Sequence, residues 1–96
     1  MTKSNYRCLE DVIGCKWSVS VLQATKNGIR RPGALERHIE GISAKVLSER
    51  LRKLVAYGLL EKHSYQELPP RTEYTLTKKG EALTRILDQI HALDQE

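Results

Sequence analysis

Through residues 9–57, apolar side chains recur at the three-four spacing of amphipathic helices, and a glycine follows each run. The runs are Leu9, Val12 and Ile13, then Trp17, Val21 and Ala24, then Leu35 and Ile39, and finally Leu47, Leu51 and Leu54. Glycine adopts the left-handed backbone that commonly ends a helix. We therefore expect four helices, which end near Gly14, Gly28, Gly41 and Gly58.

Residues 43–57 form the clearest of these helices. Ser43 is placed to cap its start by accepting a backbone N–H bond, and Gly58 stands at its end. The side opposite the apolar stripe is polar and mostly basic, and it comprises Lys45, Ser48, Glu49, Arg52 and Lys53. Only a few residues, Gly41 among them, separate this helix from the one before. The layout predicts a helix-turn-helix with 43–57 as the recognition helix.

Two short runs after Gly58, residues 59–66 and 72–76, favour strands because they are rich in tyrosine and threonine. A helix-turn-helix followed by a hairpin predicts a winged helix, a mainly α fold with a small β-hairpin. The loop at residues 67–72 is then the wing, stiffened by Pro69 and Pro70. We expect Arg71 at its tip, where it meets the minor groove or a phosphate. The alternative is a surface ion pair between Arg71 and Glu67 or Glu73.

Thr77 is placed to cap a last helix over residues 78–96. Its apolar residues follow the spacing of a coiled-coil seam, and they are Leu83, Ile86, Leu87, Ile90 and Leu93. This seam predicts a homodimer joined through the C-terminal helices. The alternative is that the helix folds back on its own domain.

Length and charge agree with a single soluble domain over residues 1–96. Residues 26–53 hold eight basic side chains against three acidic ones, whereas residues 81–96 hold one against four. A basic centre with an acidic end indicates a polyanion partner, here double-stranded DNA. No signal peptide and no apolar span of roughly 20 residues is seen, so we expect a cytoplasmic protein without membrane contact.

Chemistry beyond binding has little support in the sequence. No phosphate loop, metalloprotease motif or nucleophile elbow is present, so we expect no enzyme and no cofactor. The three histidines pair with no cysteine or acid at a metal-ligand spacing, so we expect no metal site. Cys8 and Cys15 are expected to be buried and inert. The alternative is a redox role, which requires an exposed thiol with a lowered pKa.

Three motifs in order resemble the HxlR-type winged-helix transcriptional regulators of bacteria and archaea. They are Gly-x-Lys-Trp at residues 14–17, Gly-Ile-Ser-x-Lys-Val-Leu at 41–47, and Pro-Pro-Arg-x-Glu-Tyr-x-Leu-Thr at 69–77. The resemblance covers almost the whole chain. It implies a homodimer whose first and last helices pair, with Leu9 contributing from the first helix. It also implies a DNA surface of Arg31, Ser43, Lys45, Ser48, Arg50, Arg52 and Arg71.

These expectations combine into one mechanism. The dimer places two recognition helices one turn of DNA apart, roughly 34–36 Å, on an inverted-repeat operator. We expect Arg31, Arg50 and Lys53 to bind phosphates, and Lys45, Ser48 and Arg52 to read base edges. Arg50 lies near the edge of the buried stripe and is the least certain member of the set.

The chain also departs from the family pattern. Many relatives carry a Cys-Pro pair before the first helix, and that pair falls on Ser4-Asn5 here, so the family's thiol switch does not transfer. Two other functions therefore stay open: a protein–protein interaction module without DNA binding, and a redox-responsive regulator that uses Cys8 or Cys15. The sequence does not identify an effector.

Overall fold

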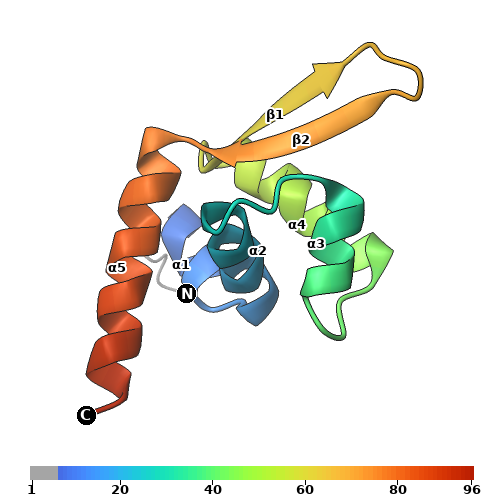
Figure 1. The fold of residues 1–96 in the computed structure, drawn as a ribbon. Helices are drawn as coiled ribbons and strands as arrows, with labels where there is room; N and C mark the ends of the chain where they lie inside the picture. The colour runs from blue at the N-terminus through green and yellow to red at the C-terminus, as the bar shows by residue number, and fades with distance from the viewer. Residues whose placement is uncertain (1–6) are drawn as a thin grey trace.

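The computed structural model describes residues 7–96 and has the winged helix-turn-helix architecture that the sequence predicts. Its elements are, in chain order, α1 (Arg7–Ile13), α2 (Lys16–Lys26), α3 (Pro32–His38), α4 (Ala44–Ala56), β1 (Leu60–Tyr65), β2 (Arg71–Leu76) and α5 (Lys78–Asp94). Figure 1 shows α3 and α4 at one side of the domain, below the far end of the hairpin, and α5 at the opposite side. Ser4 and Asn5, the positions of the family's Cys-Pro pair, lie outside the described residues.

The expected caps set the ends of α4, the second helix of the helix-turn-helix. The Ser43 hydroxyl accepts a 3.1 Å hydrogen bond from the Val46 backbone N–H, which satisfies a donor that the first turn leaves open. At the other end Gly58 has a φ of 75°, and the next residue, Leu59, donates its N–H to the Leu54 carbonyl at 2.9 Å. This pairing with a left-handed glycine is the Schellman arrangement, and it turns the chain into β1.

The core is built around α2, which contacts each of the other four helices and β2. Its Val21 and Leu22 are fully buried, as are Leu35 of α3, Leu54 of α4 and Leu59 before β1. All but Leu22 lie on the apolar stripe or strand run that the sequence predicts for their elements, and all of them meet in a single shared core.

The wing is an antiparallel pair in which Leu60 lies opposite Leu76 and Tyr65 lies opposite Arg71. Tyr74 is buried against the helices and anchors the sheet. The Tyr74 backbone N–H also donates to the Arg30 carbonyl at 2.8 Å, so the linker before α3 runs along the outer edge of β2. The hairpin is thereby fastened to the helix-turn-helix by main chain as well as by side chains.

The last helix divides its apolar residues between two sides, and this corrects the predicted seam. Leu83 and Leu87 are only 3% and 6% exposed because they face the chain's own core. Ile86, Ile90 and Leu93 are 47%, 45% and 68% exposed. The helix therefore does pack on its own domain, yet it keeps a second apolar stripe on its outer side. Within residues 7–96, none of the helices has the length and apolar content required to cross a bilayer.

Candidate nucleic-acid interface

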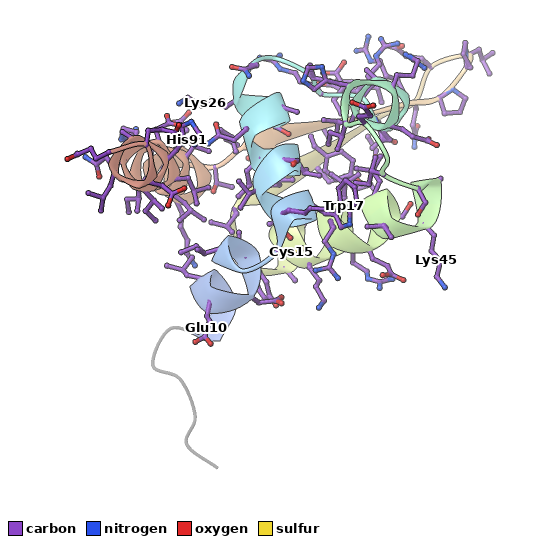
Figure 2. The ribbon with its side chains drawn as sticks, turned by 90° about the horizontal axis from the view of Figure 1, so that it is seen from below. Glu10, Cys15, Trp17, Lys26, Lys45 and His91 are labelled. Carbon is purple, nitrogen blue, oxygen red and sulfur yellow. The ribbon has the colours of Figure 1, made fainter. Side chains whose placement is uncertain are left out.

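The outward side of α4 carries the side chains that the sequence assigned to base reading. Lys45, Ser48 and Arg52 are all exposed, and their spacing of three and four residues places them in one row along the helix. Figure 2 shows Lys45 extending away from the body at the free end of α4. Within residues 7–96 no carboxylate lies at ion-pairing distance from Lys45 or Arg52. The row therefore presents uncompensated positive charge.

A second row on α4 is turned toward α1 and the start of α2, and this corrects the expectation that Arg50 and Lys53 are free for phosphates. The Lys53 ammonium lies 3.6 Å from a carboxylate oxygen of Asp11. The Arg50 guanidinium is half-buried and donates to the Cys15 sulfur at 3.8 Å. Both partners lie more than 30 positions earlier in the chain, so sequence spacing gave no sign of them.

Asp11 of α1 contacts both Lys53 of this second row and Tyr57 just after α4. The Tyr57 hydroxyl donates a 2.6 Å hydrogen bond to it, across the junction between α1 and the end of α4. That bond, followed by the positive charge of Lys53, holds the pKa of the Asp11 carboxyl below its ordinary value. The same bond raises the pKa of the Tyr57 hydroxyl. Charge and hydrogen bonding thus fasten the end of α4 to α1.

A shallow groove runs between α4 and the hairpin, beside the first row. It is lined by Pro32, Ser48, Leu51, Arg52, Val55, Lys62 and Tyr74. Lys62 was missed in the sequence because its strand carries few apolar residues to mark a face. Its register partner is the buried Tyr74, so both side chains leave the sheet on the side of the helices. Lys62 therefore joins Ser48 and Arg52 along one continuous surface.

The remaining predicted DNA contacts fall into two groups. Ser43 is exposed, and its hydroxyl oxygen accepts the capping bond from the Val46 N–H. Its O–H group is still able to donate to a phosphate. Arg31 precedes the first turn of α3, and its side chain is 59% exposed. It lies 3.9 Å from Glu73 of β2, too far for a hydrogen bond but within Coulombic reach.

Arg71 differs most from its predicted placement at the bare tip of the wing. It is the first residue of β2, and its side chain is only 30% exposed. Its guanidinium lies 4.3 Å from the centre of the Tyr65 ring and 3.3 Å from an oxygen of each of Glu67 and Glu73. The strand begins one residue earlier than expected because the pairing with Tyr65 extends the ladder. The ion pairs that formed the alternative interpretation are therefore present.

Both cysteines were expected to be buried, and neither is. Cys8 is exposed, and Cys15 is half-buried at the N-terminal end of α2. Burial raises the pKa of the Cys15 thiol, but hydrogen bonds from Ser18 and Trp17 and the charge of Arg50 outweigh it, so the net pKa is lowered. Among residues 7–96, no three His, Cys, Asp or Glu side chains are grouped as metal ligands would be.

The exposed stripe of α5 meets α1 at one side of the domain. Ile13, at the end of α1, is 42% exposed and lines the same shallow hollow as Ile90 and His91. Sequence reasoning had assigned Leu9 to this surface, but Leu9 is half-buried and packs against the core. We call Ile13, Ile86, Ile90 and Leu93 the outer apolar strip. It lies away from the row of Lys45, Ser48 and Arg52.

Comparison with known proteins agrees with this architecture. The chain is 38% identical over 86 residues to an HTH-type transcriptional regulator of Synechocystis sp., covering 90% of this chain and 64% of that relative's length. A MarR-family transcriptional regulator from Enterococcus faecalis superimposes with a TM-score of 0.83 at 36% identity, covering 99% of this chain and 89% of that one. Diamide-treated YodB from Bacillus subtilis gives a TM-score of 0.83 at 29% identity, covering 99% and 95%.

The family model described as HxlR-like helix-turn-helix matches residues 12–96, which includes α4, the hairpin and α5. The three motifs that suggested this family fall at the start of α2, at the turn into α4 and on the wing. The chain belongs to the HxlR-like helix-turn-helix family.

Proposed function

We propose that this protein is a sequence-specific DNA-binding transcriptional regulator that acts as a homodimer on an inverted-repeat operator. The observation that carries the proposal is the row of Lys45, Ser48 and Arg52 on a well-capped helix, free of carboxylate partners among residues 7–96. The major groove of DNA admits an α-helix, and lysine, serine and arginine are residues that hydrogen-bond base edges there.

The groove beside α4 extends this surface toward the wing. Lys62 lies next to the row, and Arg31 lies at the start of the preceding helix. With α4 in the major groove, these two cations are placed for the flanking phosphates, a role that sequence analysis had given to Arg50 and Lys53. Because Lys53 is engaged by Asp11 of α1 and Arg50 by Cys15 at the start of α2, we assign them chiefly to holding α4 in place.

The outer apolar strip supports the homodimer. Four large aliphatic side chains exposed by 42–68% on one side of a 96-residue domain indicate an interaction surface. A second copy of the chain can cover it by a twofold arrangement in which each strip packs on the other. Such a pair presents two α4 helices to one face of a duplex, and the operator then has the same twofold symmetry.

Selection of bound sequences from a random pool of duplex DNA tests this function directly. The expected result is a palindromic site whose half-sites lie about one helical turn apart, roughly 34–36 Å. Binding to that site should weaken steeply as salt increases, since each phosphate contact releases counterions. Failure to enrich any sequence, together with a flat salt response, would favour the protein–protein interaction module instead.

Thiol control of DNA binding is a second candidate, supported by the contact between Cys15 and Arg50. A modified Cys15 sulfur would no longer accept the hydrogen bond from Arg50, so α4 would lose one of its attachments. If this control operates, an alkylating agent should weaken operator binding by the wild type and not by Cys15→Ser. Equal responses of the two proteins would exclude Cys15 and leave the exposed Cys8 as the thiol to test.

A further inference from the structure

The carboxylate of Glu73 lies between two arginines from distant parts of the chain. One is Arg31 before α3, whose Nε is 3.9 Å from Glu73 Oε2, and the other is Arg71 on the wing, whose Nε is 3.3 Å from the same oxygen. Both arginines belong to the expected DNA surface. A single acid therefore connects the cation at the helix-turn-helix with the cation on the wing.

The position of Glu73 is fixed more firmly than that of an ordinary surface acid. Its side chain is 19% exposed, and its neighbour Tyr74 is buried and hydrogen-bonded through its backbone to Arg30. That backbone bond keeps the linker carrying Arg31 alongside β2. The carboxylate is thus held where it reaches both guanidinium groups without moving the main chain.

Arg71 is oriented by its neighbours but is not saturated by them. The ring of Tyr65 supports one side of the guanidinium at 4.3 Å, and Glu67 approaches NH2 at 3.3 Å. The Nε group is buried and has no hydrogen-bond partner among residues 7–96, because the approach of Glu73 is Coulombic and poorly aligned. This buried Nε is out of reach of a phosphate, but the terminal nitrogens of the guanidinium carry N–H donors beyond the one that faces Glu67, and a phosphate oxygen can take these up.

The two acids beside Arg71 differ in a way that separates their roles. Glu67 lies in the loop and is 50% exposed, and it contacts only one of the two arginines. Glu73 is in the strand and contacts both. A phosphate that approaches Arg71 has to displace the more exposed acid, Glu67, whereas Glu73 in the strand can stay behind the two guanidinium groups.

We propose that Glu73 is a positioning residue for DNA binding, which holds Arg31 and Arg71 as a preformed pair for the phosphate backbone. The proposal rests on the proposed function, and it adds a role for an acid on an otherwise cationic surface. Arginine side chains lose considerable rotamer freedom when they bind, so ordering them beforehand strengthens binding. Glu67 has the opposite role, since it competes with the phosphate for Arg71.

Long-range electrostatics alone predicts the reverse for Glu73. Removing a negative charge from a DNA-facing surface should tighten binding wherever the charge lies. The sign of the effect therefore distinguishes positioning from simple charge. Three substitutions that each remove one negative charge from the hairpin provide the comparison: Glu73→Gln, Glu67→Gln and, as the matched control, Glu61→Gln on the exposed side of β1.

The experiment measures affinity for a random-sequence duplex by fluorescence anisotropy at several salt concentrations, with circular dichroism melting to confirm the fold of each variant. Glu73→Gln should weaken binding by about threefold to tenfold and reduce the salt slope by about one phosphate-equivalent. Glu67→Gln and Glu61→Gln should leave binding unchanged or tighten it. In an Arg31→Ala background the loss caused by Glu73→Gln should shrink, because one of its two partners is gone.

Each outcome bears on the proposal. If the wild type binds with a steep salt response and Glu73→Gln tightens binding as Glu61→Gln does, positioning is refuted while the proposed function stands. The same conclusion follows if Glu73→Gln weakens binding equally with and without Arg31. If the wild type shows no salt-dependent binding to duplex DNA, the proposed function and the role of Glu73 both fall.

Discussion

Gly80 is the position at which a one-carbon change should have its largest effect on this fold. It lies in the first turn of α5, where the helix rests directly on the backbone after α4. A Cβ added to Gly80 would lie 2.1 Å from the Leu59 carbonyl oxygen, 3.1 Å from the Leu59 carbonyl carbon and 3.2 Å from a methyl of Leu76. Real Cβ atoms do not approach closer than 3.0 Å, so α5 has to move by about 0.9 Å.

Two opposing effects decide the result of Gly80→Ala. Alanine is favoured over glycine within a helix by about 1 kcal/mol. Against this, overpacking costs about 1–3 kcal/mol, and the displacement strains the cap in which the Thr77 hydroxyl accepts from the Gly80 N–H at 3.0 Å, a contact worth about 1 kcal/mol. We therefore expect a net loss of about 1–3 kcal/mol in the free energy of unfolding.

Thermal and urea unfolding followed by circular dichroism measure this loss. A loss of about 2 kcal/mol lowers the Tm of a domain this size by roughly 8–16 °C. Gly33→Ala in α3 is the matched control, because the nearest atom to its Cβ is the flexible end of Arg37 at 3.4 Å. That variant should be neutral or stabilised by up to about 1 kcal/mol. Gly80→Ala as stable as the wild type would refute the close docking of α5.

Four further predictions concern the core and the surfaces of the domain. Leu83→Ala should lower the free energy of unfolding by about 2–5 kcal/mol, because Leu83 is 3% exposed. Ile90→Glu should leave the domain folded but monomeric by light scattering, and a surviving dimer would remove Ile90 from the interface. Asp11→Asn should destabilise the protein most above the ordinary carboxyl pKa of 3.8. Since the pKa of Asp11 is lowered in the folded chain, the gap to wild type should close as pH falls below that range, as urea midpoints at neutral and acid pH would reveal. A gap that widens with acid would contradict the role of Asp11. Arg52→Ala should weaken binding to the selected operator by about 1–3 kcal/mol, and Arg50→Ala should weaken it less in the same anisotropy assay. The reverse order would refute the division of α4 into two rows.

The helices and their ends were predictable because their signals are local. Ser43, Gly58 and Thr77 act on backbone groups within a few residues, and the apolar spacing of α2 and α4 needs no knowledge of the partner. The start of β2 was placed one residue late because the gain from pairing Arg71 with Tyr65 depends on a residue across the hairpin. Local spacing carries no information on such a partner.

Which side chains are free within the site was less predictable for the same reason. The row of Lys45, Ser48 and Arg52 follows from helical geometry alone, and it is exposed as expected. The occupation of Lys53 by Asp11, and of Arg71 by Glu73, depends on how α1 and the hairpin dock, which no pattern in the chain encodes. For the same reason, the sequence did not show which apolar residues of α5 are buried and which are exposed, since both sets fit one helical periodicity.

The hydrogen bond from Tyr57 to Asp11 affects how strictly the protein should require one spacing between the two half-sites of its operator. This bond joins the end of α4 to α1. The DNA-facing row of α4 and the side of the domain that carries Ile13 are therefore expected to move together. Each base pair inserted between half-sites rotates one of them by roughly 35° about the DNA axis. In the proposed homodimer, the interface between protomers then has to absorb most of that twist, so binding should depend strongly on the spacing between half-sites.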